Sequence, residues 1–291
     1  MPEEYECLLY TLTDGVATIT LNRPDRMNVY NSRMRTELLS VFDRTDADDA
    51  VKAVIVTGSG RAFCAGADIS EGKDALDADR RRDPGQPLIV NGVRRDGTGM
   101  LTLRIFDSLK PVIAAINGAA AGAGATMTLP MDIRMASTEA RYGFVFARRG
   151  VTPEAASSWF LPRLVGIATS LEWCYSGKII TAQEALAAGL VRSVHAPSEL
   201  LPAAQALARD FGEHAAPVSM ALTRQMMWRM LGASHPMEAH SVDSRAIRAR
   251  GASADAKEGL TAFLEKRQPV FVDRVSDLPN VFPNWIEPDF R

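Results

Sequence analysis

Apolar and polar residues alternate along the first half of the chain in a pattern that predicts strands interleaved with helices. Residues 7–13 and 16–21 are short runs rich in β-formers, and the Asp14-Gly15 pair between them is a strong hairpin signal. Residues 51–57 (V-K-A-V-I-V-T) and 111–116 (P-V-I-A-A-I) are almost continuously apolar, as expected of strands that are buried on both faces. Strands of this kind separated by helices predict stacked parallel βαβ units.

Segments with helical periodicity lie between these strands, and they make up most of the chain beyond residue 153. Ser32 is expected to cap a helix that runs to about residue 42, and another helix is expected over 99–108. Short strands are expected at 132–136 and, late in the chain, at 190–194. The other expected helices cover residues 154–165, 169–176, 182–188, 198–213, 218–230, 236–249 and 254–266.

The change from mixed to helical character suggests a core over residues 1–200 and a helical region over 201–268. Residues 70–97 are charged and contain R-R-R-D-P-G-Q-P, which predicts a surface insertion, mobile or lid-like, at the edge of a site. The tail at 269–291 is rich in proline and aromatic residues, and we expect it to pack on another subunit. The aromatic residues of the tail that motivate this expectation are Phe271, Phe282, Trp285 and Phe290.

Composition and charge exclude several classes of function. The 291 residues are 46% hydrophobic with a formal net charge of −2, so the broad basic field of a nucleic-acid-binding protein is missing. Cys7, Cys64 and Cys174 lie far apart, which fits a reducing cytoplasm better than a disulfide framework. The four histidines show no zinc-ligand spacing, so we expect no metal. No apolar run is long enough to span a bilayer, so we expect no membrane partner.

Two junctions that follow the buried strands carry candidate chemistry. Residues 61–69 contain Gly66 among small residues, and residues 117–126 contain Gly122 and Gly124 where a helix is expected to start. A helix start offers unpaired N–H groups, and two such junctions on neighbouring strands can direct two amides at one oxygen, as in an oxyanion hole. Taken singly, each junction is better explained as a tight turn with close helix packing, and the glycine spacing is incomplete for a dinucleotide-binding fingerprint.

Glu154 is the most interesting acidic residue, and the residues around it allow two interpretations. It follows Pro153 and precedes a run of small residues, so on sequence grounds alone it reads as a first-turn glutamate that complements a helix dipole. The alternative is a carboxylate that acts in chemistry.

Taken together, these segments resemble the crotonase (enoyl-CoA hydratase/isomerase) superfamily from residue 5 to about 268. The resemblance implies an α/β fold, a crotonase (ClpP-like) spiral of stacked ββα units with a C-terminal α-helical trimerisation region, and assembly into a homotrimer or a dimer of trimers. The matching stretches are N-R-P-D-R-M-N at 22–28, F-C-A-G-A-D-I at 63–69, P-V-I-A-A-I-N-G-A-A-A-G-A-G at 111–124, M-D-I-R-M-A at 131–136, the segment 149–166, and S-A-D-A-K-E-G-L-T-A-F-L-E-K-R at 253–267.

The resemblance also implies which residues form the site. The oxyanion-hole donors fall on the backbone N–H groups of Ala67 and Ala123, and Glu154 becomes the candidate catalytic side chain. An acyl-CoA thioester is the implied partner, with no cofactor beyond the coenzyme A that enters as part of the substrate. The expected substrate-binding residues are Arg26, Ala65, Gly66, Asp68, Ile69, Gly122, Phe146, Trp159 and Lys266, the last of these often reaching the site from a neighbouring subunit.

The chain departs from the family pattern where hydratases carry two glutamates. Those positions hold Thr126 and Phe146, neither of which can act as a carboxylate base. Glu154 matches the position of the single glutamate in peroxisomal-type Δ3,Δ2-enoyl-CoA isomerases. Isomerisation with Glu154 as single acid/base is therefore the favoured hypothesis. Hydration of a 2-enoyl-CoA by Glu154 and a non-catalytic acyl-CoA-binding scaffold are the alternatives.

Overall fold

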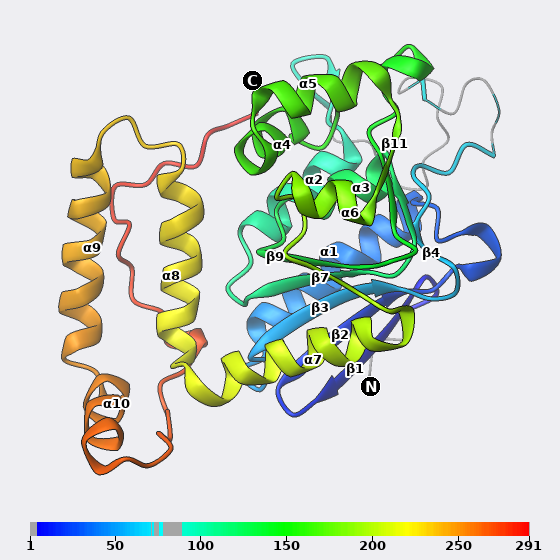
Figure 1. The fold of residues 1–291 in the computed structure, drawn as a ribbon. Helices are drawn as coiled ribbons and strands as arrows, with labels where there is room; N and C mark the ends of the chain where they lie inside the picture. The colour runs from blue at the N-terminus through cyan, green and yellow to red at the C-terminus, as the bar shows by residue number, and fades with distance from the viewer. Residues whose placement is uncertain (1–4, 71, 73–75, 78–88, 291) are drawn as a thin grey trace.

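The fold is that of a computed structural model, which describes residues 5–70, 72, 76–77 and 89–290. A six-stranded sheet with the order β1-β2-β3-β7-β9-β12 forms its centre (Figure 1). The hairpin pair β1/β2 is antiparallel, and the remaining neighbours are parallel, as the apolar runs predicted. The strands are β1 (Leu8–Thr13), β2 (Val16–Leu21), β3 (Ala53–Gly58), β7 (Val112–Ile116), β9 (Ile133–Ser137) and β12 (Ser193–His195).

A second sheet, which the sequence analysis did not anticipate, lies over the first. Its four strands have the order β11-β10-β8-β4, with parallel pairing except between β10 and β11. Each strand has only three residues: β4 (Ala62–Cys64), β8 (Ala119–Ala121), β10 (Arg141–Gly143) and β11 (Ile179–Thr181). A separate hairpin of β5 (Ile89–Val90) and β6 (Val93–Arg94) closes the segment expected to be an insertion. Most of that segment, and with it the lid prediction, lies outside the described residues.

Alternate residues of the central strands face two different layers. Val54 and Val56 point toward the second sheet and the helices around it, whereas Ala53 and Ile55 pack against α7 (Pro197–His214) on the opposite face. Because α7 covers the central sheet, the core continues past residue 200 and the separate helical region begins after α7. The helices on the other face are α1 (Ser32–Ala47), α2 (Gly97–Phe106), α3 (Ala123–Thr126), α4 (Ser157–Val165), α5 (Ile167–Ser176) and α6 (Ala182–Ala187), with short 3-10 turns η1 (Pro24–Arg26) and η3 (Ala147–Arg149).

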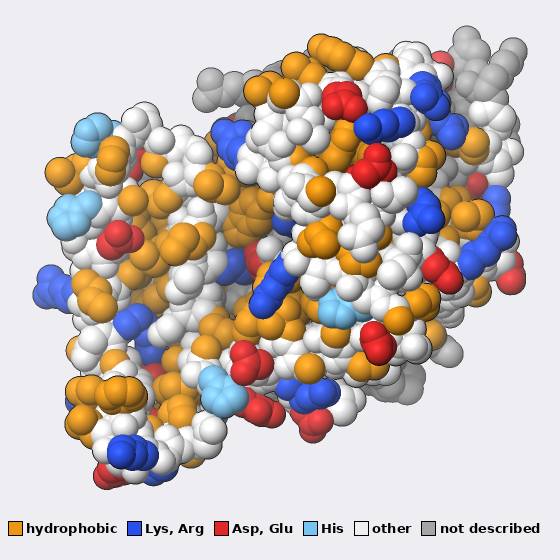
Figure 2. All heavy atoms as spheres, viewed as in Figure 1, with side chains coloured by type: hydrophobic (Ala, Val, Ile, Leu, Met, Phe, Trp, Pro, Cys, Tyr) orange, Lys and Arg blue, Asp and Glu red, His pale blue; other side chains and the backbone are white. Residues whose placement is uncertain are grey.

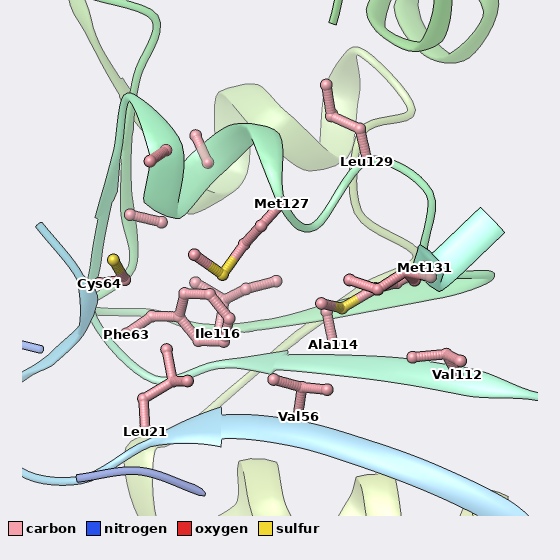
Figure 3. Packing of buried hydrophobic residues seen from close by; sticks show 14 of the residues in the cluster. Leu21, Val56, Phe63, Cys64, Val112, Ala114, Ile116, Met127, Leu129 and Met131 are labelled. Carbon is pink, nitrogen blue, oxygen red and sulfur yellow. The ribbon is translucent and has the colours of Figure 1, made fainter. Parts of the chain in front are cut away.

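Side chains from both sheets interlock in the main core. Leu21 and Val56 from the central sheet meet Phe63 from the second sheet and Met127, the C-cap of α3, and all four are at most 1% exposed (Figure 3). The start of α1 corrects one prediction. Asn31, and not Ser32, is the N-cap, because its side chain accepts a hydrogen bond from the N–H of Met34 at 2.9 Å.

Three helices, α8 (Pro217–Met230), α9 (Pro236–Gly251) and α10 (Ala254–Glu265), stand apart from the core as an arm (Figure 1). The tail returns between α8 and α9, and its Val281 is buried with Leu222 and Val242. The aromatic tail residues find partners in their own chain, since Phe282 and Trp285 lie against the Arg229 guanidinium, at 4.7 and 5.0 Å. Hydrophobic side chains remain exposed on the arm (Figure 2).

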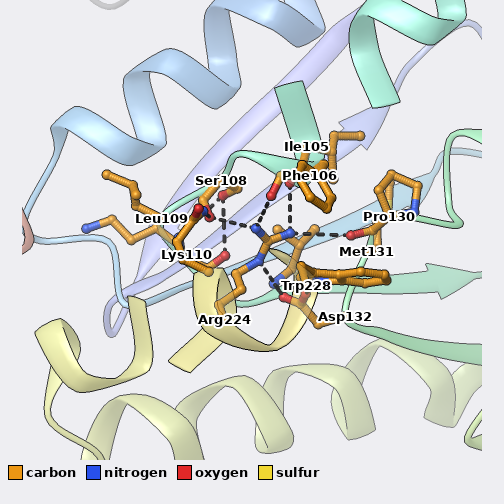
Figure 4. Close-up of polar contacts among 12 residues, drawn as sticks. Ile105, Phe106, Ser108, Leu109, Lys110, Pro130, Met131, Asp132, Arg224 and Trp228 are labelled. Carbon is orange, nitrogen blue, oxygen red and sulfur yellow. Dashed lines mark hydrogen bonds and ion pairs between the residues drawn. The ribbon is translucent and has the colours of Figure 1, made fainter. Parts of the chain in front are cut away.

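One buried side chain fixes the arm to the core. The Arg224 guanidinium of α8, with 4% of its side chain exposed, pairs with Asp132 at 2.9 Å and donates to the carbonyl oxygens of Ile105, Phe106 and Ser108 at 2.7 Å each (Figure 4). Trp228 adds a hydrogen bond to Asp132 at 2.7 Å. None of the described helices is both long and apolar enough to cross a bilayer.

Candidate active site

A pocket of about 550 Å³ opens where strands β4 and β8 end. The two strands are parallel neighbours, so the residues that follow them emerge at the same edge, and Ala67 and Ala123 both line the pocket. The two junctions that follow these strands approach each other closely. A Cβ on Gly66 would lie 3.0 Å from the Ala121 oxygen, and one on Gly124 would lie 1.9 Å from the Cys64 oxygen. Glycine is therefore required for the two junctions to pack together.

The N–H of Ala67 is left free by a bridge between two neighbouring segments. Tyr30 donates its N–H to the Gly66 oxygen at 2.8 Å, and Asp68 donates its N–H to the Tyr30 oxygen at 2.8 Å. Ala67, which lies between the two bonded positions, makes no such bond to any residue in the described part of the chain. The fully buried Asn28 supports this arrangement through its amide, which donates to the Ala62 oxygen at 2.8 Å.

The N–H of Ala123 is free because it begins a helix. Gly122, with a φ of 49°, turns the chain out of β8 and donates its own N–H to the Gly143 oxygen at 2.9 Å. Ala123 is the first residue of α3, where a backbone N–H has no intrahelical acceptor, and we find no other acceptor for it among the described residues. Two residues with unpaired amides thus line one pocket.

Glu154 lies on the same pocket but not at a helix start, which corrects the first-turn interpretation. Helix α4 begins only at Ser157, because Ala155 and Ala156 adopt left-handed φ values of 60° and 52°. The backbone of Ala155 is held on both sides. Its N–H donates to Asp96 Oδ2 at 2.7 Å, and its oxygen accepts from the Thr102 hydroxyl at 3.0 Å.

The environment of Glu154 favours its neutral form. Desolvation raises its pKa from 4.5 to about 7, and the nearby Asp96 charge acts in the same direction. Hydrogen bonds to the carboxylate from Thr126 and Thr98 oppose the rise in pKa, and the Thr126 hydroxyl lies 2.5 Å from Oε1. A carboxyl with a pKa near neutrality can both accept and return a proton.

Many of the predicted site residues do meet on the pocket wall, whereas four do not. Arg26 and Asp68 form an ion pair at 3.2 Å outside the wall, and Trp159 packs on the Phe160 ring, with centroids 4.8 Å apart. Lys266 ends α10 on the arm, so its approach from a neighbouring subunit stays a prediction. The predicted residues on the wall are Ala65, Gly66, Ala67, Ile69, Gly122, Ala123, Phe146 and Glu154.

Sequence reasoning missed the polar residues that surround Glu154. Asp96 lies inside the expected insertion, although an aspartate followed by Gly-Thr-Gly and an apolar periodic segment is an N-cap signal. In the sequence Thr126 is notable only as a departure from the glutamate pattern, whereas in the structure its hydroxyl donates to Glu154. The pocket wall also includes four arginines, Arg35, Arg94, Arg95 and Arg149.

Comparisons with known proteins agree with this geometry. A model of the enoyl-CoA hydratase/isomerase family matches residues 11–274. "Enoyl-CoA hydratase ACTT3" of Alternaria alternata is 40% identical over 265 residues, covering 91% of this chain and 85% of that protein. "1,2-epoxyphenylacetyl-CoA isomerase" of Escherichia coli K12 is 33% identical over 276 residues, covering 92% of this chain and 99% of that protein.

Solved structures agree as well. The crystal structure of a putative enoyl-CoA hydratase from Streptomyces coelicolor A3(2) superimposes with a TM-score of 0.83 at 30% identity, covering 94% of this chain and 96% of that one. The predicted crotonase fold with C-terminal helices is confirmed. The chain is therefore an enzyme of the enoyl-CoA hydratase/isomerase (crotonase) family.

Proposed function

We propose that this protein isomerises a 3-enoyl-CoA to a 2-enoyl-CoA, with Glu154 as the single acid/base. The observation that carries the proposal is the Glu154 carboxyl on the same pocket wall as two unpaired backbone amides. The two positions that supply glutamates in hydratases hold Thr126 and Phe146. A proton shift within one molecule needs only one base, because the proton removed from one carbon is returned to another.

In the proposed reaction the thioester oxygen accepts hydrogen bonds from the N–H groups of Ala67 and Ala123. The Glu154 carboxylate removes a proton from C2. The C–H electron pair forms the C1–C2 double bond of a dienolate, whose negative charge rests on the thioester oxygen. Protonated Glu154 then delivers the proton to C4, while the double bond moves to C2–C3 and the carbonyl re-forms. Preorganised amides at such an oxygen typically contribute about 3–4 kcal/mol each to transition-state stabilisation.

Replacing Glu154 with glutamine tests the role of the base. We expect Glu154→Gln to lower kcat for 3-hexenoyl-CoA by about 10²–10⁴-fold, the usual range for general base catalysis. Binding of the CoA thioester, followed by calorimetry, should survive because the amides are intact. Glu139→Gln, on the turn before β10 and at the opposite end of the strands from the pocket, is the matched control. Unchanged turnover in Glu154→Gln would remove this residue from the mechanism.

The raised pKa of Glu154 gives the reaction a defined pH dependence. The carboxylate is the active form, so kcat/KM should rise with pH through a midpoint of about 7 and level off above it. An ordinary glutamate would place this limb near pH 4.5. The measurement is kcat/KM for 3-hexenoyl-CoA between pH 5 and 9.

Hydration of a 2-enoyl-CoA is the second candidate, because several relatives bear hydratase names. Water addition needs one group to activate water and another to deliver the proton, and Asp96 is already committed to three backbone amides. We therefore expect crotonyl-CoA hydration to be slower than 3-hexenoyl-CoA isomerisation. The reverse ratio would favour the hydratase assignment.

The assembly remains part of the proposal. Exposed apolar side chains on α9 and α10 support contacts between copies of the arm in a homotrimer or a dimer of trimers, among them Ile247, Leu260, Phe263 and Leu264. Light scattering after size exclusion measures the number of copies, and a monomer would contradict this part of the proposal.

A further inference from the structure

The turn that carries Glu154 has an unfavourable backbone conformation. Ala155 and Ala156 are consecutive residues with left-handed φ values of 60° and 52°, although alanine strongly prefers right-handed helix. Each such residue costs roughly 1–2 kcal/mol. A turn of this kind persists only when neighbouring groups hold it in place.

The first turn and a half of α2 provides the groups that hold it. Asp96 caps this helix, with Oδ1 accepting from the Thr98 N–H at 3.0 Å and Oδ2 accepting from the Gly99 N–H at 2.9 Å. The same Oδ2 accepts the N–H of Ala155 at 2.7 Å, and the Thr102 hydroxyl donates to the Ala155 oxygen at 3.0 Å. Both polar groups of the residue next to Glu154 are therefore fixed by one helix.

Asp96 also brings a negative charge close to the Glu154 carboxyl. The largest cause of the raised pKa of Glu154 is desolvation, and the Asp96 charge is the next contribution. Burial holds the pKa of Tyr30 well above its ordinary value and raises that of Cys64 to about 12, so both stay neutral where Glu154 titrates. The titratable and charged groups around Glu154 on the pocket wall and beneath it are Asp96, Tyr30, Cys64, Arg35, Arg94, Arg95 and Arg149.

We propose that Asp96 is a positioning residue, which aims Glu154 at the substrate by holding the Ala155 amide and places a second negative charge beside it on the pocket wall. The inference rests on the proposed role of Glu154. It assigns one carboxylate two separable actions, one through a hydrogen bond and one through its charge.

Two substitutions separate these actions. In Asp96→Ser the hydroxyl still caps α2, since serine is a good N-cap, but the shorter side chain loses the Ala155 amide. We expect kcat to fall by about 10²-fold, the size of effect that a small misplacement of a catalytic group produces, with KM within about threefold. In Asp96→Asn one oxygen can still accept the Ala155 N–H while the charge is gone. We expect most of kcat to return, with the acid limb of kcat/KM moved to lower pH.

A measurement that does not depend on turnover completes the test. In protein labelled with δ-¹³C glutamate, the Glu154 signal is identified by its loss in Glu154→Gln and is then titrated in wild type, in Asp96→Asn and in the control Glu139→Gln. We expect a lower titration midpoint only in Asp96→Asn. Thermal melts show whether Asp96→Ser is folded, and Thr102→Val, which releases the other side of Ala155 and leaves Asp96 in place, provides a second variant if it is not.

The possible results test the charge effect, the positioning and the role of Glu154 separately. An unmoved midpoint in Asp96→Asn would overturn the charge effect. Wild-type kcat in both Asp96→Ser and Thr102→Val would overturn the positioning. A midpoint that moves while the pH profile of kcat/KM stays fixed would instead overturn the proposed function of Glu154 and leave the contact with Asp96 standing.

Discussion

The two sides of the pocket are built in different ways. The amide side, at Ala67 and Ala123, consists of main chain held by adjacent strands and by glycines that permit close contact. The base side, at Glu154, depends on side chains from distant elements, since Thr126 from α3 and Asp96 from the start of α2 both support it. The amides are thus fixed by the fold itself, whereas the carboxylate is tuned by a few replaceable contacts.

This difference suggests which side can change without loss of the fold. Backbone donors remain after most side-chain substitutions, so stabilisation of a thioester oxygen is preserved under sequence change. The position and pKa of a carboxyl depend on its neighbours and change with them. In the proposed reaction the amide side holds the thioester oxygen, and the base side moves the proton.

A large effect on activity is expected from breaking the amide side. Gly66 has a φ of 110°, where an L side chain is strained, and its Cβ position lies 3.0 Å from the Ala121 oxygen, so we expect Gly66→Ala to shift the neighbouring Ala67 amide. We expect kcat/KM for 3-hexenoyl-CoA to fall by about 10²–10³-fold, the cost of one lost oxyanion donor.

Gly166→Ala is the control for backbone strain alone. Gly166 also has a positive φ, of 78°, but among the described residues no atom beyond Gly166 and its two chain neighbours lies within 4 Å of its Cβ position. Equal losses in the two variants would show that strain, and not the position of the amide, lowers activity.

A moderate effect on the free energy of unfolding is expected from removing the charge of Glu154, on the base side of the pocket. The pKa of Glu154 is about 7 in the fold against 4.5, so the native state binds this proton more tightly than the unfolded state. The folded protein therefore loses stability as pH rises from 4.5 to 7, and the loss is complete above 7. Glutamine carries no such penalty.

We accordingly expect Glu154→Gln to be more stable than wild type at pH 8 by ~1–3 kcal/mol, the lower part of the range reflecting a pocket open to water. The two proteins should be equal near pH 4. Urea unfolding at both pH values measures the difference in free energy of unfolding between the two proteins. The same difference at both pH values would show that charge is not its cause.

A smaller effect is expected from Thr126→Val, which removes the hydroxyl that donates to Glu154. Because this hydrogen bond lowers the pKa of the carboxyl, its loss should raise that pKa further. We expect kcat/KM to fall by about tenfold at pH 7 and to recover partly above pH 8. Thr126→Ser, which keeps the donor, should resemble wild type, and a pH-independent loss in Thr126→Val would point to packing instead.

The fold could be predicted where segments are long and periodic. The β1/β2 hairpin, β3, β7 and the helices of the second half all occur near the expected residues. The second sheet could not be predicted, because three-residue strands are too short to show alternation, and β8 consists only of alanine. Its stability comes from pairing with strands that are distant in sequence.

The site could be predicted only in part, for a related physical reason. Ala67 and Ala123 follow from local glycine and helix-start signals together with the family resemblance. The turn at Ala155 and Ala156 contradicts local propensity, since Pro153-Glu154 before a run of small residues favours a helix start. Contacts with Asp96 and Thr102, more than 50 residues earlier in the chain, override that preference.

The hydrogen bonds of the Arg224 guanidinium affect how the protein unfolds on heating. It crosses from α8 to five acceptors in the core, four of them main-chain oxygens, and separating the arm would leave these groups and a cation without partners. The arm and the core should therefore lose their structure together, and a calorimetric scan of the full chain should show a single heat-absorption peak.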